Sequence, residues 1–478
     1  MPNTKNKNTK KKTYKKSTSA SKRYLKPRWS WLSQSKKGIM YIDGISVTDL
    51  INKYGTPLYV VVERELRSRL RRFKSSFPYP NLRPQYACKC NSNLEIMRIA
   101  REEGFELDAS SVGEIILALL ADFKPHEITF TNLYKTEQDI MFAAKVGVQA
   151  ITVDSIEEIK RVAAVGEKVK TKIRLFIRVN PMIEFRGYTT KNHKYGIPYG
   201  VAKKAIDIAI ASPNIDLIGL HFHGSNMDYP KSYYLGMGKL VRLAKYCKEK
   251  GVTIRFVDMG GGFPVQYNNE NIYVPEDMGK IFVRKFLKLL DKYQLEKPVL
   301  VFEPGKFIVA NTGIGLTRVI SKKRLKKQKI LITDGSTYAF LPDVIVDDRY
   351  YDVLPANKMN KKGNQVYSIE GCTCDVIDEM ARKRRLPFLS EGDVLAFMDV
   401  GAYSNVLASN FNTLKRAPMV MIKENGAVKI IRRRDRYSEM FAPELDVLKI
   451  AGPKEMKRFY DLFRINVENF WKGSTKKR

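Results

Sequence analysis

Between residues 63 and 315 the apolar positions switch repeatedly between two spacings. Short, nearly continuous apolar runs are typical of buried strands, and the stretches between them repeat an apolar residue every three or four positions, as amphipathic helices do. The stretches with helical spacing are 94–103, 113–120, 137–146, 156–165, 201–211, 234–250 and 279–293. The strand-like runs are 85–91, 105–110, 127–132, 150–154, 174–180, 217–223, 255–259 and 300–303.

Eight strands that alternate with helices over about 230 residues have the number and length of a (β/α)8 barrel, or TIM barrel. An open, doubly wound sheet would show the same alternation but rarely needs eight such units. We therefore expect residues 63–315 to form a TIM barrel of the α/β class.

After Gly313 the pattern changes to short β-rich runs with few helices, at 329–333, 365–369, 393–397 and 419–422. These runs predict a second, mostly β domain, either a barrel or a sandwich. Residues 38–62 have the pattern of short strands with a Gly-Thr-Pro turn at 55–57, and they are expected to join that domain. The expected division is a disordered basic tail at 1–37, the barrel at 63–315, and a β domain at 38–62 and 316–465.

The basic tail stands out in the charge distribution. The chain has 85 Lys or Arg against 50 Asp or Glu, a net charge of +35, and residues 1–40 hold 13 of these bases and no acid. The first 28 residues have almost nothing to bury, so disorder is expected, and they lack the apolar segment of a secretory signal. Nucleic acid or another acidic surface is conceivable as a partner only through this tail, and the absence of a recognised nucleic-acid motif favours a solvated basic surface.

The cysteines and apolar runs limit the other classes of protein. Five cysteines without a CxxC pair, together with only four histidines, argue against a disulfide framework and against a zinc site, so no metal is expected. No apolar run approaches the length of a membrane span. These features favour a cytoplasmic protein.

Polar residues and glycines gather at the C-terminal ends of the expected strands, which is where barrel active sites lie. They are Lys89, Asp108, Asn132, Asn180, His223, Gly260, Gly261, Gly262, Glu303, Pro304 and Gly305. His221 and His223 share one face of a strand, and His223 is nearer the mouth.

Three of these features together indicate a pyridoxal-phosphate enzyme. Lys89 has a buried stem and a reachable tip, which suits a Schiff base with an aldehyde, although an ordinary solvated lysine is the alternative. The glycines at 260–262 let backbone N–H groups approach a phosphate, although a tight turn needs them equally. Glu303, unless it forms a structural ion pair, is a carboxylate that could keep the pyridine nitrogen protonated.

Several spaced motifs then identify a family. They are Tyr-Ala-Cys-Lys-Cys-Asn-Ser-Asn at 86–93, Phe-Glu-Leu-Asp-Ala-Ser-Ser-Val-Gly-Glu-Ile at 105–115, Val-Asp-Met-Gly-Gly-Gly-Phe-Pro at 257–264, Glu-Pro-Gly-Lys at 303–306, Gly-Cys-Thr-Cys-Asp-Val-Ile-Asp at 371–378 and Gly-Ala-Tyr at 401–403. In this order, from about residue 38 to 450, the sequence resembles the fold-type III pyridoxal-phosphate decarboxylases of ornithine, arginine and diaminopimelate, and is most similar to those of diaminopimelate. The resemblance implies an alanine-racemase-like barrel with pyridoxal 5'-phosphate as cofactor.

The resemblance also implies roles for individual residues. Lys89 would hold the cofactor as an aldimine, with His223 stacked on its ring and Glu303 at the pyridine nitrogen. The phosphate would contact Ser225, Gly261, Gly262 and Tyr403, and Asp108, Pro304, Gly305 and Lys306 would complete the cofactor site. The substrate would contact Lys306, Asp375 and Tyr403.

The family shares its active sites between two subunits, so a homodimer is expected. Cys374, carried on a loop into the neighbouring subunit's site, would protonate Cα after carbon dioxide leaves. Cys372 is a competitor for this role, but the motif favours Cys374.

Four departures from the family pattern bear on the site and its substrate. The family's His-x-Gly-Ser is shortened here to His223-Gly224-Ser225, which leaves His221 as a fallback for the stacking histidine. Lys306 replaces the arginine of Glu-Pro-Gly-Arg, and Leu341-Pro342 with Ile345 replace an Arg-Pro pair and a tyrosine. Asp375 replaces a glutamate and is more typical of ornithine, lysine and arginine decarboxylases.

Two substrate classes therefore stay open. The expected reaction is meso-2,6-diaminopimelate to L-lysine and carbon dioxide, and the alternative is decarboxylation of ornithine, lysine or arginine to a diamine or polyamine precursor. A racemase or a non-catalytic regulatory relative fits less well, because a racemase needs a second base and a dead homologue has no need of Lys89, Glu303 and Cys374 together.

Overall fold

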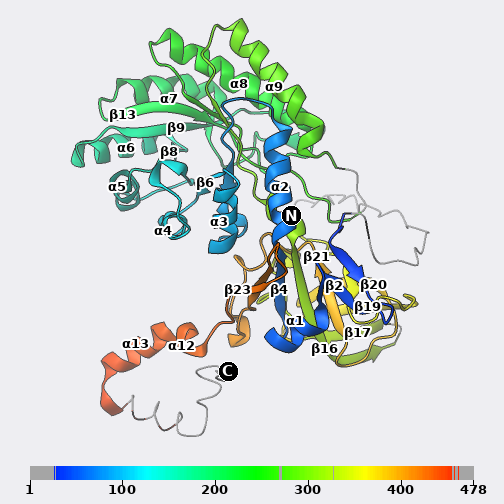
Figure 1. Cartoon of the computed structure of the whole chain (residues 1–478). Coiled ribbons are helices and arrows are strands. Elements are labelled where there is room, and N and C mark those ends of the chain that lie inside the picture. Colours follow the sequence, from blue (N-terminus) through cyan, green and yellow to red (C-terminus); the bar gives the residue numbers. More distant parts are fainter. Residues whose placement is uncertain are drawn as a thin grey trace, which may run out of the picture.

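The chain forms two packed bodies, a barrel and a β-rich domain (Figure 1). The computed structural model describes residue 26 and residues 28–268, 272–326, 328–454, 457 and 461. In Figure 1 the barrel lies above the β-rich domain, and the helices α12 (Tyr437–Met440) and α13 (Ala442–Ala451) reach outward from the latter. None of the helices in these described ranges has the length and apolarity needed to cross a bilayer.

The eight expected barrel strands are all present and parallel. In chain order they are β5 (Gln85–Ala87), β6 (Glu106–Ala109), β7 (Ile128–Thr131), β8 (Ala150–Val153), β9 (Ile173–Asn180), β13 (Ile215–His221), β14 (Phe256–Asp258) and β15 (Val299–Val301). Each pairs with the next in this order. Backbone N–H groups of Arg83 and Gln85 donate to the carbonyls of Leu300 and Phe302, which joins the last strand to the first. The prediction of a TIM barrel is confirmed.

Helices cover the outside of this barrel. They are α3 (Leu94–Glu102), α4 (Val112–Leu120), α5 (Glu137–Val146), α6 (Ile156–Lys168), α7 (Tyr199–Ala211), α8 (Pro230–Glu249) and α9 (Pro275–Lys292). Their apolar faces are buried against the strands. The helix α2 (Glu63–Ser76) precedes the first strand and packs against α9, so it fills the position next to the last barrel helix.

A mixed sheet forms the β-rich domain. Its strands are β4 (Leu58–Val62), β16 (Gly313–Leu325), β17 (Gln328–Thr333), β18 (Val353–Pro355), β19 (Gln365–Glu370), β20 (Glu379–Leu386), β21 (Val394–Met398), β22 (Met419–Ile422) and β23 (Val428–Arg432). The four expected runs appear as β17, β19, β21 and β22. The early strand β4 lies between β16 and β22, so the first β segment joins the later ones. The exact limits of the two domains stay a prediction.

Two sequence expectations were wrong near the N-terminus. The segment 38–62 is not all strand, because α1 (Val47–Tyr54) begins where the Ser46 side chain accepts the N–H of Thr48. Residues 28–37 are not tail: Trp29 and Trp31 are buried, and β1 (Leu32–Gln34) pairs with β2 (Met40–Ile42).

Trp29 and Trp31 lie in a polar stretch of sequence, so average composition does not predict that they are buried. Arg28 forms ion pairs with Asp352 at 2.5 Å and Asp399 at 2.9 Å, and Trp29 donates to the Asp399 carboxylate. The Asp399 carboxylate is itself buried, so this N-terminal segment is fixed to the β-rich domain. The tail is expected to be disordered and to be the only segment that could bind an acidic partner. Its residues 1–25 lie outside the described residues.

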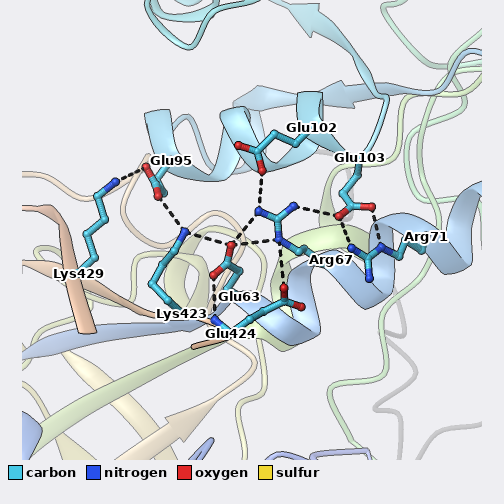
Figure 2. A network of polar contacts seen from close by, with 9 residues as sticks. All are labelled: Glu63, Arg67, Arg71, Glu95, Glu102, Glu103, Lys423, Glu424 and Lys429. Atoms are coloured by element: carbon cyan, nitrogen blue, oxygen red, sulfur yellow. Dashed lines mark hydrogen bonds and ion pairs between the residues drawn. The ribbon is translucent and has the colours of Figure 1, made fainter. Parts of the chain in front are cut away.

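An ionic network joins the barrel to the β-rich domain (Figure 2). Its centre is Glu63, the first residue of α2, which accepts from Arg67 on the same helix and from Lys423 after β22. Lys423 also pairs with Glu95 of α3 at 3.1 Å, and Arg67 pairs with Glu102 and Glu103. Three elements from two domains thus meet at one buried carboxylate.

We predict that Glu63→Gln lowers the free energy of unfolding by about 2 kcal/mol, since it leaves Arg67 and Lys423 without their shared counter-charge. Burial raises the pKa of Glu63, but the Glu424 N–H and the Lys423 and Arg67 side chains lower it by more. A lowered carboxyl pKa stabilises the fold above its ordinary value of 4.5, and this contribution disappears as the pH falls through the lowered pKa.

Denaturant unfolding of wild type and variant at pH 7 and at pH 3 measures both effects. The difference between the two proteins should be present at pH 7 and smaller at pH 3. Glu102→Gln is the matched control, because Glu102 belongs to the same network but is 56% exposed, and its loss should cost less than about 0.5 kcal/mol. Equal losses in both variants would contradict the central position of Glu63.

Candidate active site

Lys89 lies at the barrel mouth, on a short 3-10 turn (Cys88–Cys90) that follows β5. Its Nζ is 2.8 Å from the Asp108 carboxylate at the end of β6, and its side chain is 34% exposed. Burial lowers the pKa of Lys89, but the Asp108 and Glu303 carboxylates raise it by more. The ammonium is thus anchored yet reachable, as the sequence predicted.

The turn that carries Lys89 is held from both sides. Asn93 caps α3 by accepting the Glu95 N–H, which fixes where the turn ends. The Asn91 amide donates to the Gly401 carbonyl, and the Tyr403 N–H donates to the Cys90 carbonyl at 2.8 Å. Tyr403, which comes from the β-rich domain, therefore lies directly against the Lys89 turn.

Glu303 lies between the two candidate histidines. Its Oε1 is 3.0 Å from His221 Nε2, and its Oε2 is 3.5 Å from His223 Nδ1. His221 and Glu303 are fully buried, whereas His223 is 19% exposed and lies just beyond the end of β13. Burial lowers the pKa of His223 to about 4, so its ring is neutral at physiological pH. His223 is the histidine nearer the mouth.

A buried aspartate beside Glu303 was not singled out from the sequence. Asp258, the last residue of β14, has one carboxylate oxygen on the Gly260 N–H at 2.8 Å. Burial and the nearby Glu303 carboxylate raise its pKa, while the histidines hold the pKa of Glu303 low against the effect of burial. The two neighbouring carboxyl groups are thus shifted in opposite directions, Asp258 toward the neutral form and Glu303 toward the ionised form. Its place at a strand end, like that of Asp108, was the signal that could have found it.

The groups expected to hold a phosphate gather across the mouth. A Cβ at Gly262, whose φ is +99°, would lie 1.9 Å from the Ser225 carbonyl, so this glycine permits a close approach of two loops. The Gly261 N–H donates to His223 Nδ1 at 3.1 Å and is therefore engaged. The Gly262 N–H and the Ser225 and Tyr403 hydroxyls donate to no other described residue.

The shortened His223-Gly224-Ser225 segment is accommodated by backbone conformation. Ser225 adopts φ +62°, and the Tyr188 hydroxyl donates to the Gly224 carbonyl at 2.6 Å. A Cβ at residue 224 would lie 2.1 Å from that hydroxyl, so a glycine is required. His223 and Ser225 both remain at the mouth despite the missing residue.

This donor set fits pyridoxal phosphate. Lys89 offers an amine, Glu303 and Asp108 offer buried carboxylates, and Asp108 Oδ1 has no hydrogen-bond partner among the described residues. The unengaged N–H and hydroxyls at Gly262, Ser225 and Tyr403 are the donors that a phosphate needs.

Residues 304–306 continue the site beyond Glu303. The Pro304 carbonyl accepts the Ala87 N–H, and a Cβ at Gly305 would lie 3.0 Å from Cys90 Sγ, so both residues adjoin the Lys89 turn. Lys306 Nζ donates to the Asn226 side-chain oxygen at 3.1 Å. Burial, with the nearby Arg349 charge, lowers the pKa of Lys306 to about 8.

Cys374 and Asp375 lie elsewhere, on the loop between β19 and β20 of the β-rich domain. Cys374 contacts the Asn412 side chain, and Asp375 accepts the Tyr338 hydroxyl, which lowers the Asp375 pKa. Neither makes a hydrogen bond or ion pair with a described barrel residue. Within one chain the structure does not bring them to Lys89.

The loop that carries Cys374 is organised by a residue that sequence reasoning also missed. Asp378 is buried and accepts the N–H and hydroxyl of Thr337 with one oxygen and those of Thr373 with the other. Around this fixed loop, Val376 is 91% exposed and Ile377 51% exposed. Two apolar side chains are therefore exposed on the same loop as Cys374.

Comparisons with known proteins agree with this geometry. Residues 63–310 match the pyridoxal binding domain of the pyridoxal-dependent decarboxylases. The diaminopimelate decarboxylase of Methanothermobacter thermautotrophicus is 32% identical over 419 residues, covering 84% of this chain and 95% of that relative. The diaminopimelate decarboxylase of Archaeoglobus fulgidus is 30% identical over 409 residues, covering 84% and 96%.

A solved structure shows the same likeness. The diaminopimelate decarboxylase of M. jannaschii in complex with L-lysine superposes with a TM-score of 0.82 at 28% identity, covering 87% of this chain and 98% of that one. The family match spans more than half of the 478 residues and contains the whole barrel site around Lys89. The chain therefore belongs to the pyridoxal-dependent decarboxylase family, enzymes of the carboxy-lyase class that use pyridoxal 5'-phosphate.

Proposed function

We propose that this protein decarboxylates meso-2,6-diaminopimelate to L-lysine. The observation that carries the proposal is the barrel mouth, where Lys89 faces Asp108 at 2.8 Å and Lys306 offers a second cation for the far end of a long substrate. Support for the substrate comes from relatives of at least 30% identity that carry the name diaminopimelate decarboxylase and from the related structure that holds L-lysine.

The chain's own residues have distinct tasks in this reaction. Pyridoxal phosphate, when bound, supplies a sink for the electron pair left at Cα when the bond to the carboxylate breaks. Lys89 would hold the cofactor, and the neutral His223 ring would pack on it. Glu303, whose pKa is held low by His221, would offer a negative charge to the pyridine nitrogen, and the neighbouring Asp258 has a raised pKa. Ser225, Gly262 and Tyr403 would bind its phosphate.

The proton that replaces the carboxylate at Cα comes, in this proposal, from Cys374 of a second subunit. The Cys374 loop makes no contact with Lys89 in its own chain, and exposed Val376 and Ile377 flank it. Phe411, which is 38% exposed and has its ring tilted against that of Tyr338 at 4.4 Å between centroids, continues this apolar surface. A homodimer that covers these side chains brings the thiol into the neighbouring barrel. The cytoplasm suits such an enzyme, since all five cysteines are free thiols.

Carbon dioxide release from a panel of substrates tests the proposed function. Purified protein loaded with pyridoxal phosphate is offered meso-diaminopimelate, ornithine, lysine and arginine, and the amine product is identified by mass spectrometry. We expect release from diaminopimelate with formation of lysine. Release from ornithine, lysine or arginine instead would make Asp375 the better guide to the substrate, and inactivity on all four would contradict a decarboxylase.

A further inference from the structure

A cluster of charges beside Lys306 includes an arginine that no part of the account has used. Arg349 is 18% exposed, and its Nε lies 3.2 Å from the Asp343 carboxylate, which is 5% exposed. The guanidinium lies over the ring of Tyr267, 4.5 Å from its centroid. Tyr267 belongs to the loop after β14 at the barrel mouth, so Arg349 lies across from strand ends that carry the site.

Donors in this cluster remain available. Arg349 uses Nε on Asp343 and one terminal nitrogen on Asp347, and its Nη1 donates to no described residue. The buried Tyr267 hydroxyl also lacks a hydrogen-bond partner within the described ranges. Buried polar groups of this kind are rarely left unpaired, so these two donors are available to a polar ligand.

Lys306 belongs to the same cluster electrostatically. Burial and the positive charge of Arg349 lower its pKa, while Asp343 and Asp228 act in the opposite direction. Lys306 and Arg349 repel each other, and both are partly withdrawn from water. A bound carboxylate would stabilise both positive charges. Asp343 adds the acceptor that an ammonium group needs.

The far end of diaminopimelate has these two groups on one carbon. An uncompensated carboxylate in a partly buried pocket is costly, so the substrate requires cations there. Position 341, where the family carries an arginine, is a fully buried leucine here, and Ile345 is apolar, so neither can bind a carboxylate. Arg349 is eight residues further along the same segment.

We propose that Arg349, held by Asp343 and Tyr267 at the barrel mouth, binds the far carboxylate of the substrate together with Lys306, and that Asp343 binds the adjacent ammonium. The inference rests on the proposed function and adds the residues that select an amino-acid end over a plain amine. A planar fork with several N–H donors suits a carboxylate better than the lysine ammonium alone.

The decisive comparison is between L-lysine, the product that keeps the far carboxylate, and cadaverine, which has the same two amines but lacks that carboxylate. In Arg349→Gln we expect the KM for diaminopimelate and the inhibition constant of L-lysine to rise about tenfold or more, with kcat within about threefold and inhibition by cadaverine nearly unchanged. Arg349→Lys should fall between wild type and Arg349→Gln. Asp343→Asn should weaken binding of diaminopimelate, L-lysine and cadaverine alike, because all three carry the far ammonium.

Arg255→Gln is the control, because Arg255 forms an exposed ion pair with Asp216 at the opposite end of the barrel, and its loss should leave KM and the inhibition constants unchanged. The visible spectrum of each variant verifies that the cofactor site is intact. Wild-type activity with an unchanged KM in Arg349→Gln, or a parallel loss for L-lysine and cadaverine, would overturn this inference alone. Wild-type protein that does not decarboxylate diaminopimelate would contradict the proposed function itself, and the inference with it.

Discussion

Lys89→Ala should leave a folded protein that has lost the visible absorbance of lysine-bound cofactor and more than about a thousandfold of its turnover. The amine of Lys89 is the group placed to bond covalently to the cofactor aldehyde, and its ammonium is the partner of buried Asp108. Absorbance spectra and carbon dioxide release measure both losses.

Lys89→Arg is the control that separates charge from covalent chemistry. It keeps a cation beside Asp108 but cannot form the same bond, so it should retain more stability than Lys89→Ala with no more activity. Persistence of the cofactor absorbance in either variant would show that another amine holds the cofactor.

Cys374→Ala should retain the cofactor absorbance while turnover falls by about 10²- to 10⁴-fold, the usual range for loss of a proton donor. The thiol lies on a loop fixed by Asp378, so its removal should not disturb the barrel. Rates measured at saturating substrate separate this loss from a change in binding.

Cys372→Ala is the matched control, two residues away on the same loop. Cys372 is also exposed, but burial of its thiol raises the pKa to about 11, and its Sγ faces the Asp334 carbonyl of its own domain. Its loss should change turnover by less than about threefold. A larger effect at 372 than at 374 would reassign the proton donor.

The barrel could be predicted from the sequence because each of its strands is a nearly continuous apolar run buried on both sides. The site residues on those strands followed, since every parallel strand ends at the same face. The limit of the N-terminal tail could not be predicted in this way. Trp29 and Trp31 are two apolar residues in a polar stretch, and only the pairing of Arg28 with Asp352 and Asp399 shows why they are buried.

Contacts between domains explain the other gaps. Tyr403 was expected at the cofactor from a motif alone, and its position against the Lys89 turn depends on how the β-rich domain packs, which no local pattern encodes. Arg349 is separated from Lys306 by 43 positions and shares no motif with it. Glu303 contacts both His221 and His223 because of the register between β13 and the last barrel strand. The periodicity of apolar residues does not predict that register.

Mixing the two inactive variants tests the central claim, that Lys89 of one subunit and Cys374 of another form one active site. Separately purified Lys89→Ala and Cys374→Ala proteins are unfolded together, refolded with pyridoxal phosphate and assayed with meso-diaminopimelate. Random pairing places one intact site in half of the dimers, so recovery of about one quarter of wild-type activity is predicted. If the refolded mixture contains dimers and wild-type protein refolded in the same way is active, absence of recovered activity in the mixture would contradict a site shared between subunits.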